Sequence, residues 1–147
     1  MSITENNISD YITYQEAVKS QTAVRLNIVN KPSVSELACM RSVAHHCFDP
    51  LCERFEIKIG ISSFYRSAQL NKAIGGAKKN SQHIKGQAID IDADMFGGIT
   101  NSEIFNWLKE NVQFDQLIWE FGNKLNPAWV HISFVNHLTN RNQIILL

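Results

Sequence analysis

The sequence has little proline, glycine and cysteine and no excess of charge of either sign. Three prolines and seven glycines in 147 residues are too few for a collagen-like or low-complexity chain. Fourteen basic residues balance fourteen acidic ones, so no overall field attracts a polyanion, and nucleic acid is not an expected partner. No apolar run approaches the ~20 residues of a membrane span, and the N-terminus lacks the basic and apolar blocks of a secretion signal. We expect a soluble protein synthesised in the cytoplasm without a signal peptide.

What the sequence does contain fits one globular domain. Hydrophobic residues make up 44% and charged residues 19%, a mixture that can bury a core. We expect one domain over residues 1–147, with a loosely ordered segment over residues 1–20. Three cysteines cannot all pair within one chain, so we expect Cys39, Cys47 and Cys52 to be buried thiols rather than disulfides or metal ligands.

The first half of the chain predicts one long helix, one strand and one short helix. Ser33 and Glu36 have the spacing of a capping box, and apolar residues then recur every three or four positions as far as Arg54. Apolar and polar residues alternate over 55–61, which is the period of a strand with one buried face. A short helix over 67–74 should follow.

The second half predicts strands around one further helix. After a polar loop at 77–81, alternation predicts a strand over 88–92. A second capping box, at Thr100, predicts a helix that ends near Asn111. Two strands that suit hairpin-like pairing complete the pattern, over residues 117–121 and 129–134. Early helices and late strands are typical of an α+β fold, so we expect a small, mainly antiparallel sheet packed by helices.

Three residues with metal-ligating side chains lie on these expected elements. His83 lies on a loop, Asp90 on the strand that follows, and His131 within the last strand. Zn²⁺ accepts imidazole nitrogen and carboxylate oxygen, and a catalytic zinc site needs only three protein ligands because water takes the fourth position. Each residue alone is also open to a structural role, and strand parity makes Asp92 and Asp94 rival carboxylates.

The pattern Ser-x-His-x-x-Gly-x-Ala-x-Asp, followed by Trp-x-His, joins these residues into one motif. It resembles the zinc D-Ala-D-Ala carboxypeptidase family, which includes the D,D-peptidases of vancomycin resistance and the L-alanyl-D-glutamate endopeptidases of bacteriophage endolysins. The fold of this family is also similar to the signalling domain of Hedgehog proteins. Further blocks resemble a phage-associated branch of the family: residues 64–67, 70–71, 75–76, 81–83, 115–120 and 129–133.

The resemblance implies that one Zn²⁺ ion is bound by His83, Asp90 and His131. It also implies a carboxylate that takes a proton from the attacking water and delivers it to the leaving amine. Many family members carry this acid three residues before the last histidine ligand, where this chain has Ala128. We therefore expect Glu120, on the preceding strand, to fill the role.

The resemblance also implies groups that contact the substrate. Arg66 corresponds to an arginine that steadies the substrate carbonyl or the oxyanion beside the metal, a task that suits a fixed guanidinium. Tyr65, Gln82 and Ser81 are expected to bind substrate, although Ser81 could instead orient His83. The other histidines lie outside the motif and are expected to be structural or exposed: His45, His46 and His137.

The motif thus predicts a zinc metallopeptidase that cuts an amide bond in the peptide stem of bacterial peptidoglycan, as a D,D-carboxypeptidase or as an endopeptidase. The alternative is a catalytically silent, zinc-containing binding module of the same fold, and the position of Glu120 relative to the metal ligands distinguishes the two. A protein without zinc would require the motif to be a coincidence. The expected partner is the stem peptide, bound by a monomer. A small catalytic domain without an export signal is typical of a bacteriophage enzyme that reaches the wall after lysis begins or from the virion.

Overall fold

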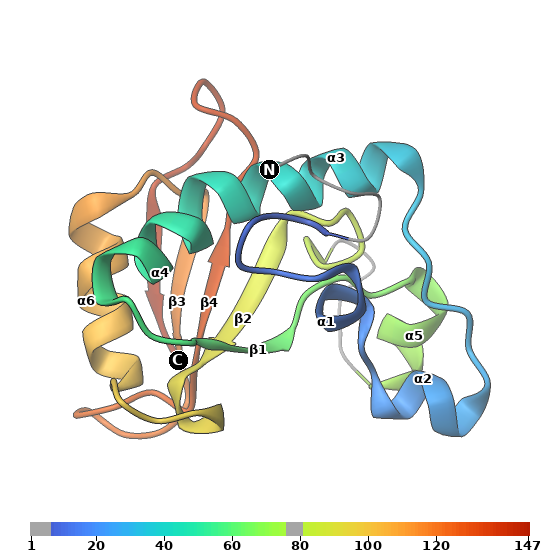
Figure 1. Cartoon of the computed structure of the whole chain (residues 1–147), viewed down its shortest axis with the longest axis horizontal. Helices are drawn as coiled ribbons and strands as arrows, with labels where there is room; N and C mark the ends of the chain where they lie inside the picture. Colours follow the sequence, from blue (N-terminus) through green and yellow to red (C-terminus); the bar gives the residue numbers. More distant parts are fainter. Residues whose placement is uncertain (1–6, 76–80) are drawn as a thin grey trace.

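A five-stranded sheet forms the centre of the protein, for which a computed structural model describes residues 7–75 and 81–147 (Figure 1). The strands are β1 (Gly60–Ser63), β2 (Ala88–Asp92), β3 (Gln116–Glu120), β4 (Trp129–Ser133) and β5 (Gln143–Leu146). Their order in the sheet is β1-β2-β4-β3-β5. Neighbouring strands are antiparallel except β3 and β5, which are parallel. The predicted α+β fold with a mainly antiparallel sheet is confirmed.

Helices pack against this sheet. They are α1 (Tyr14–Val18), α2 (Gln21–Leu26), α3 (Val34–Val43), a π-helical turn (Ala44–Phe48), α4 (Asp49–Phe55), α5 (Ala68–Ala73), a 3-10 turn (Ala93–Met95) and α6 (Asn101–Asn111). Figure 1 shows α3 and α4 as one continuous rod, with α6 beside β3. Both predicted capping boxes are formed, at Ser33 and at Thr100. Among the described residues, no helix combines the length and the hydrophobicity needed to cross a bilayer.

The two central strands separate the hydrophobic core from the functional face. Ile89 and Ile91 of β2 and Ile132 of β4 are completely buried in the core beneath the helices. Because successive side chains of a strand point to opposite faces, Asp90 and His131 lie on the other face of the sheet. The alternation that builds the core therefore also presents the metal-ligating side chains.

The long helix predicted over 33–54 contains a π-helical turn that the apolar pattern does not show. Pro50 has no amide hydrogen to donate to the carbonyl of His46, and its ring would crowd that carbonyl in a regular α-helix. The backbone widens just before it, where the Asp49 N–H bonds to the carbonyl of Ala44, five residues back. The proline thus explains the change of helix type without a break in the rod.

The strand predicted over 55–61 is wrong for most of its length. Phe55 is the last residue of α4, and Glu56 ends the helix in the left-handed conformation, with φ of 53°. The strand begins only at Gly60. Phe55 and Ile57 pack partly against the core from a helix end and a turn, which produces the same alternation as a half-buried strand.

Both ends of the chain contribute more structure than their sequence patterns indicate. The expectation of a loosely ordered N-terminal segment is wrong for residues 7–20, because Ile8, Ile12 and Ala17 are buried in the core. At the other end, the sequence analysis did not predict β5, which pairs with β3 at the edge of the sheet. Three of its four residues are exposed, so it lacks the alternating burial that identifies a strand.

Most of the remaining predictions are confirmed. The described elements match the helices predicted over 67–74 and 100–111 and the strands predicted over 88–92, 117–121 and 129–134, within one or two residues at each end. The polar loop expected at 77–81 lies outside the described residues apart from Ser81. The cysteines are free, with Cys47 and Cys52 buried and Cys39 half-buried.

Candidate metal centre

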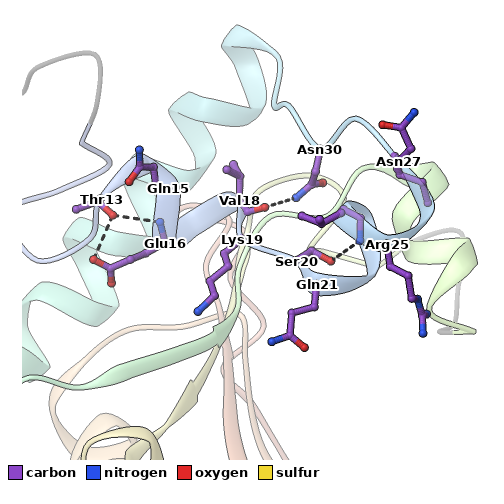
Figure 2. Close-up of a pocket in the computed structure, with 13 residues that line it drawn as sticks. Thr13, Gln15, Glu16, Val18, Lys19, Ser20, Gln21, Arg25, Asn27 and Asn30 are labelled. Atoms are coloured by element: carbon purple, nitrogen blue, oxygen red, sulfur yellow. Dashed lines mark hydrogen bonds between the residues drawn. The ribbon is translucent and has the colours of Figure 1, made fainter.

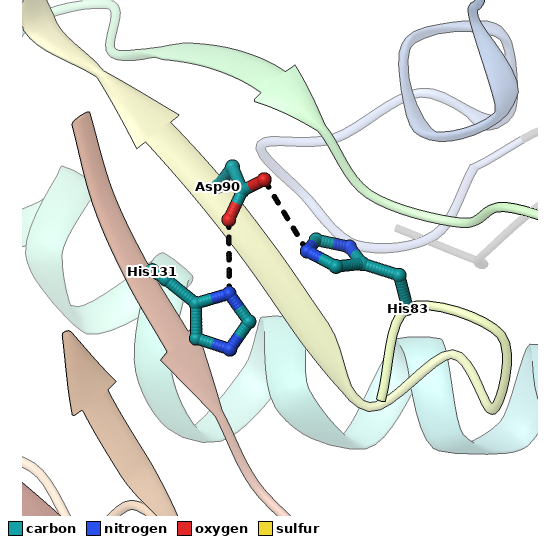
Figure 3. A group of neighbouring side chains, drawn as sticks. All are labelled: His83, Asp90 and His131. Carbon is teal, nitrogen blue, oxygen red and sulfur yellow. Dashed lines mark hydrogen bonds and ion pairs between the residues drawn. The ribbon is translucent and has the colours of Figure 1, made fainter. Parts of the chain in front are cut away.

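The fold brings together the three side chains of the sequence motif. Asp90 of β2 and His131 of β4 are directly opposite each other in the antiparallel register, and His83 reaches them from the loop before β2 (Figure 3). One ligand atom from each residue lies within 4.8 Å of the others. His83 is 2% exposed and His131 8% exposed, so the group is largely shielded from water. We call these three residues the metal cluster.

The loop that carries His83 is shaped by local hydrogen bonds and by a glycine. The Ser81 hydroxyl accepts a hydrogen bond from the His83 amide, and the Gln82 carbonyl accepts one from Gln87. Gly86 has φ of +74°, and a Cβ atom there would lie 2.6 Å from the carbonyl oxygen of Glu36 in α3. A residue without a side chain is therefore required where the loop packs against the helix.

A backbone carbonyl determines which nitrogen of His83 is available to a metal. The Nδ1 atom lies 2.7 Å from the carbonyl oxygen of Phe64, which can only accept, so we assign the proton to Nδ1. In a neutral ring, Nε2 then carries a lone pair, and it lies 3.2 Å from Oδ2 of Asp90. Two acceptors at this distance repel each other unless a proton or a cation lies between them. Histidine ligands of zinc are commonly oriented by such a second hydrogen bond.

The second oxygen of Asp90 completes the cluster. Oδ1 lies 3.0 Å from Nδ1 of His131. Burial opposes ionisation of Asp90, but the neighbouring charges and hydrogen bonds of His83 and His131 outweigh it and hold the pKa of the carboxyl well below its usual range. Ligands about 2 Å from a tetrahedral zinc ion lie about 3.3 Å apart, and each imidazole lies close to that distance from one oxygen of Asp90, at 3.2 Å for His83 and 3.0 Å for His131. The donor set of two imidazoles and one carboxylate therefore fits Zn²⁺.

Glu120 lies on the same face of the sheet as the metal cluster. Ile118 of β3 is directly opposite His131, and Glu120 is two residues further along β3, opposite Trp129. Diagonal neighbours on one face have Cβ atoms about 7–8 Å apart, within reach of a glutamate side chain. Burial raises the pKa of Glu120, as does the charge of Asp90, while His131 lowers it. The carboxyl is thus electrostatically linked to two of the three ligands.

The strand pairing places Glu120 beside Ala128, the position where many members of the family that the motif resembles carry their acid. The Ala128 N–H donates to the carbonyl of Glu120, at 2.9 Å, so the two residues are neighbours across the β3–β4 turn. The side chain of Glu120 therefore leaves the backbone next to residue 128. The sequence analysis expected Glu120 to fill this role from the preceding strand, and the register explains why it lies beside residue 128.

Arg66 follows β1, and its backbone lies beside that of His83. Its amide donates to the carbonyl of His83, at 3.3 Å. Burial lowers the pKa of the guanidinium and the charge of Asp90 raises it, which places the two side chains within electrostatic reach. Within the described parts of the chain, the buried Nε atom has no hydrogen-bond partner. With Ser62 and Ser63, Arg66 lines a cavity of about 450 Å³ beside the strand that pairs with Asp90.

The residues predicted to bind substrate have other contacts. Tyr65 is 5% exposed and its hydroxyl donates to Glu36, so its side chain supports α3 rather than facing the metal cluster. Burial, with the charge and hydrogen bond of Glu36, raises the pKa of the Tyr65 hydroxyl to about 12. The Gln82 amide donates to Asp115, at 2.9 Å. Ser81 caps the loop of His83, which matches the orienting role considered for it.

Asp115 is a structural residue of the site that the sequence analysis did not identify. It is 2% exposed, and its two oxygens accept hydrogen bonds from Gln82 and from the backbone and guanidinium of Arg141. The side chain thus joins the His83 loop to the start of β3 and to the C-terminal segment. Its position directly before a predicted strand was visible in the sequence, but its partners lie 33 and 26 residues away.

Neither rival carboxylate belongs to the metal cluster. Asp92 accepts hydrogen bonds from the Asp94 amide and the Asn101 side chain and so caps the 3-10 turn. Asp94 is exposed.

A larger cavity, of about 1110 Å³, lies against α1 and α2 and is lined by residues between Thr13 and Asn30 (Figure 2). Neither this cavity nor the one beside Arg66 is lined by a residue of the metal cluster.

Comparison with known proteins agrees with this geometry. No curated protein matches the chain. A model of the Peptidase M15 family matches residues 10–133, a span that includes all three residues of the metal cluster, Glu120 and Arg66. Peptidases of this family depend on zinc and act on peptidoglycan-type substrates. With the match extending over most of its length, the chain belongs to the Peptidase M15 family.

Proposed function

We propose that the protein hydrolyses an amide bond in the peptide stem of bacterial peptidoglycan, using one zinc ion. The observation that carries this proposal is the convergence of His83, Asp90 and His131 on one buried point, with Nε2 of His83 directed at Asp90. His83 would bind the ion through Nε2, Asp90 through its carboxylate and His131 through an imidazole nitrogen. When bound, zinc lowers the pKa of water and polarises a carbonyl group.

The side chains around the ion have separate tasks in this proposal. Glu120 accepts the proton of the attacking water and transfers it to the leaving amine. A pKa raised by burial favours a group that must both accept and release a proton near neutral pH. Arg66 holds the substrate carbonyl oxygen and stabilises the negative charge that develops on it.

The position of Glu120 favours an enzyme over a silent binding module. A silent module needs the metal ligands but no carboxylate on their face of the sheet. Glu120 lies on that face, and its pKa responds to both Asp90 and His131. A monomer suffices for this chemistry, because every proposed group comes from one chain. The bacteriophage origin and the action at the wall after lysis begins stay predictions.

The experiment that tests the proposal is digestion of purified muropeptides by zinc-loaded protein, followed by mass spectrometry. Loss of terminal D-Ala identifies a D,D-carboxypeptidase, and release of stem fragments identifies an endopeptidase. Both activities should disappear with chelator and return with zinc. Glu120→Gln should keep one zinc and lose cleavage, whereas Glu110→Gln, on the exposed surface of α6, should cleave normally. A zinc-loaded protein that cleaves no muropeptide would contradict the proposal and favour the binding module.

A further inference from the structure

Asn30 makes three hydrogen bonds that join two distant segments of the chain. Its Nδ2 atom donates to the carbonyls of Val18, at 2.9 Å, and Tyr65, at 3.1 Å. Its Oδ1 atom accepts from the Ser67 amide, at 2.8 Å. Figure 2 shows the bond to Val18 at the end of α1. The two bonds to Tyr65 and Ser67 bracket the residue between them, which is Arg66.

The same short segment is attached to the metal cluster on its other side. The Phe64 carbonyl accepts from Nδ1 of His83, and the Arg66 amide donates to the carbonyl of His83. The backbone around Arg66 is therefore held by His83 and by Asn30 together. Since Nε of Arg66 has no partner within the described residues, its own hydrogen bonds do not fix that end of the guanidinium. The hydrogen bonds of His83 and Asn30 to the backbone around Arg66 must therefore help to fix the position of its side chain.

We propose that Asn30 is a positioning residue, which sets the place of the Arg66 side chain relative to the metal cluster. This inference rests on the role of Arg66 in the proposed function. Only an amide side chain can donate twice and accept once at this point. Aspartate would lose both donors and set a negative charge against the Val18 and Tyr65 carbonyls, and alanine would lose all three bonds.

The bond to Val18 extends this role to a second part of the cavity wall. Lys19 follows Val18 directly, and both Lys19 and Arg66 line the cavity of about 450 Å³. Asn30 therefore cross-links the backbone beside each of the two cationic side chains. A shift in either wall would change how a substrate carbonyl meets Arg66, and displacements of about 1 Å can reduce turnover by about 100-fold.

The test uses Asn30→Ala and Asn30→Asp. Both should keep one zinc per chain, because Asn30 contacts no side chain of the metal cluster. Their kcat should fall by about 10–100-fold, the range for residues that orient a functional group without contacting the substrate. Asn106→Ala is the matched control: it makes the same change on the exposed surface of α6, away from residues 64–67, and its kcat should stay within about twofold of wild type.

Combining each change with Arg66→Ala tests whether Asn30 acts through Arg66. If it does, Asn30→Ala should cause no further loss of kcat in the Arg66→Ala background. Losses that multiply in the double variant would overturn the proposal, as would a zinc-loaded Asn30→Asp protein with wild-type kcat. Asn30→Asp keeps the acceptor for Ser67, so it remains informative even if Asn30→Ala does not fold.

A second readout needs no activity at all. Amide hydrogen exchange at Ser67 should be at least about tenfold faster in Asn30→Ala than in wild type, and the Nε–H resonance of Arg66 should shift or broaden in both variants. Asn106→Ala should change neither signal. Unchanged signals in the Asn30 variants would overturn the positioning role. If wild-type protein cleaves no muropeptide while these signals change as expected, the proposed function fails and the structural coupling stands.

Discussion

The five histidines of the chain divide into two groups that use the same side chain differently. In the metal cluster, His83 and His131 both face the carboxylate of Asp90. In the second group, which we call the helix-side group, the rings of His45, His46 and His137 pack against one another. The centroid of the His46 ring lies 5.1 Å from that of His45 and 4.9 Å from that of His137.

The difference lies in what surrounds the rings. The ring of His46 also packs 4.4 Å from that of Phe134, and Nδ1 of His137 bonds to the Gln113 side chain. No carboxylate bridges the rings of the helix-side group within the described ranges 7–75 and 81–147. Three imidazoles in contact therefore do not make a metal site. A shared carboxylate, burial and a fixed tautomer distinguish the metal cluster.

Two carboxylates that are largely shielded from water, Asp90 and Asp49, differ in pKa according to whether imidazoles contact them. Asp90, between two imidazoles, has a pKa well below its usual range, although its burial acts in the opposite direction. Asp49, on the rod near the helix-side group, accepts a hydrogen bond from the Ser9 hydroxyl, at 2.7 Å. Burial raises the pKa of Asp49 to about 6, outweighing the effect of this bond. Contact with imidazoles, rather than burial, determines which carboxylate keeps its negative charge down to low pH.

The largest expected effect is loss of the metal from one group only. His83→Ala and His131→Ala each remove a ligand, so we expect less than about a tenth of the wild-type zinc content and no measurable cleavage. His46→Ala and His137→Ala should keep one zinc per chain. Metal analysis by mass spectrometry after dialysis checks this prediction. Zinc lost on changing His46 or His137 would show that the comparison assigns the metal to the wrong group.

The second-largest expected effect separates catalysis from metal binding, on the face of the sheet that carries the metal cluster. Glu120→Gln keeps the size of the side chain but cannot accept a proton, so kcat should fall by about 10²–10⁴-fold with zinc content unchanged. Single-turnover cleavage of a muropeptide, with zinc measured in the same sample, gives both values. Zinc-loaded Glu120→Gln with full activity would remove this residue from the mechanism.

Much of this arrangement is predictable because its signals are local. The capping boxes at Ser33 and Thr100 mark helix starts that the structure reproduces, and alternation over 88–92 identifies β2 to the residue. These features depend on neighbours within a few positions. The metal site was predictable on a different ground, because the motif that joins His83, Asp90 and His131 resembles a known family, and the structure brings the three residues together.

The parts that could not be predicted depend on partners that the sequence does not reveal. The proton on Nδ1 of His83 is set by the carbonyl of Phe64, and every residue has such a carbonyl. The adjacency of Glu120 to His131 depends on the β3–β4 register. The sequence analysis did not identify Asn30, whose three hydrogen-bond partners lie 12 to 37 residues away.

A smaller expected effect concerns the free energy of unfolding and tests the role of Asp49. With a pKa of about 6 in the folded protein and 3.8 as its ordinary value, Asp49 binds its proton more tightly when folded. Its contribution to stability is therefore full below about pH 4 and is lost as the pH rises through 6. Asp49→Asn removes the charge and keeps an acceptor for Ser9, so it should be about 1–3 kcal/mol more stable than wild type at pH 7.5.

Urea unfolding of metal-free protein at pH 4 and pH 7.5 measures this difference, which should shrink toward zero at the lower pH. Metal-free samples are needed because protons compete with zinc for the histidine ligands. Asp10→Asn, on the exposed surface nearby, should show no comparable gain. An Asp49→Asn protein that gains equally at both pH values would show that packing, rather than charge, limits stability at this position.

The smallest effect tests whether the helix-side group behaves as mutually repelling imidazoles. Burial lowers the pKa of His46 below 6.5, and the neighbouring His45 and His137 lower it further. The unfolded chain therefore takes up this proton first, and stability falls as the pH drops below 6.5. His46→Phe keeps the ring packed on Phe134 without a charge. The melting temperature of metal-free protein should thus fall by about 2 °C less between pH 7.5 and 5.5 than in wild type. His137→Gln removes one neighbouring charge and should give a smaller change in the same direction. If the melting temperatures of wild type, His46→Phe and His137→Gln all fall equally between the two pH values, these rings do not repel one another.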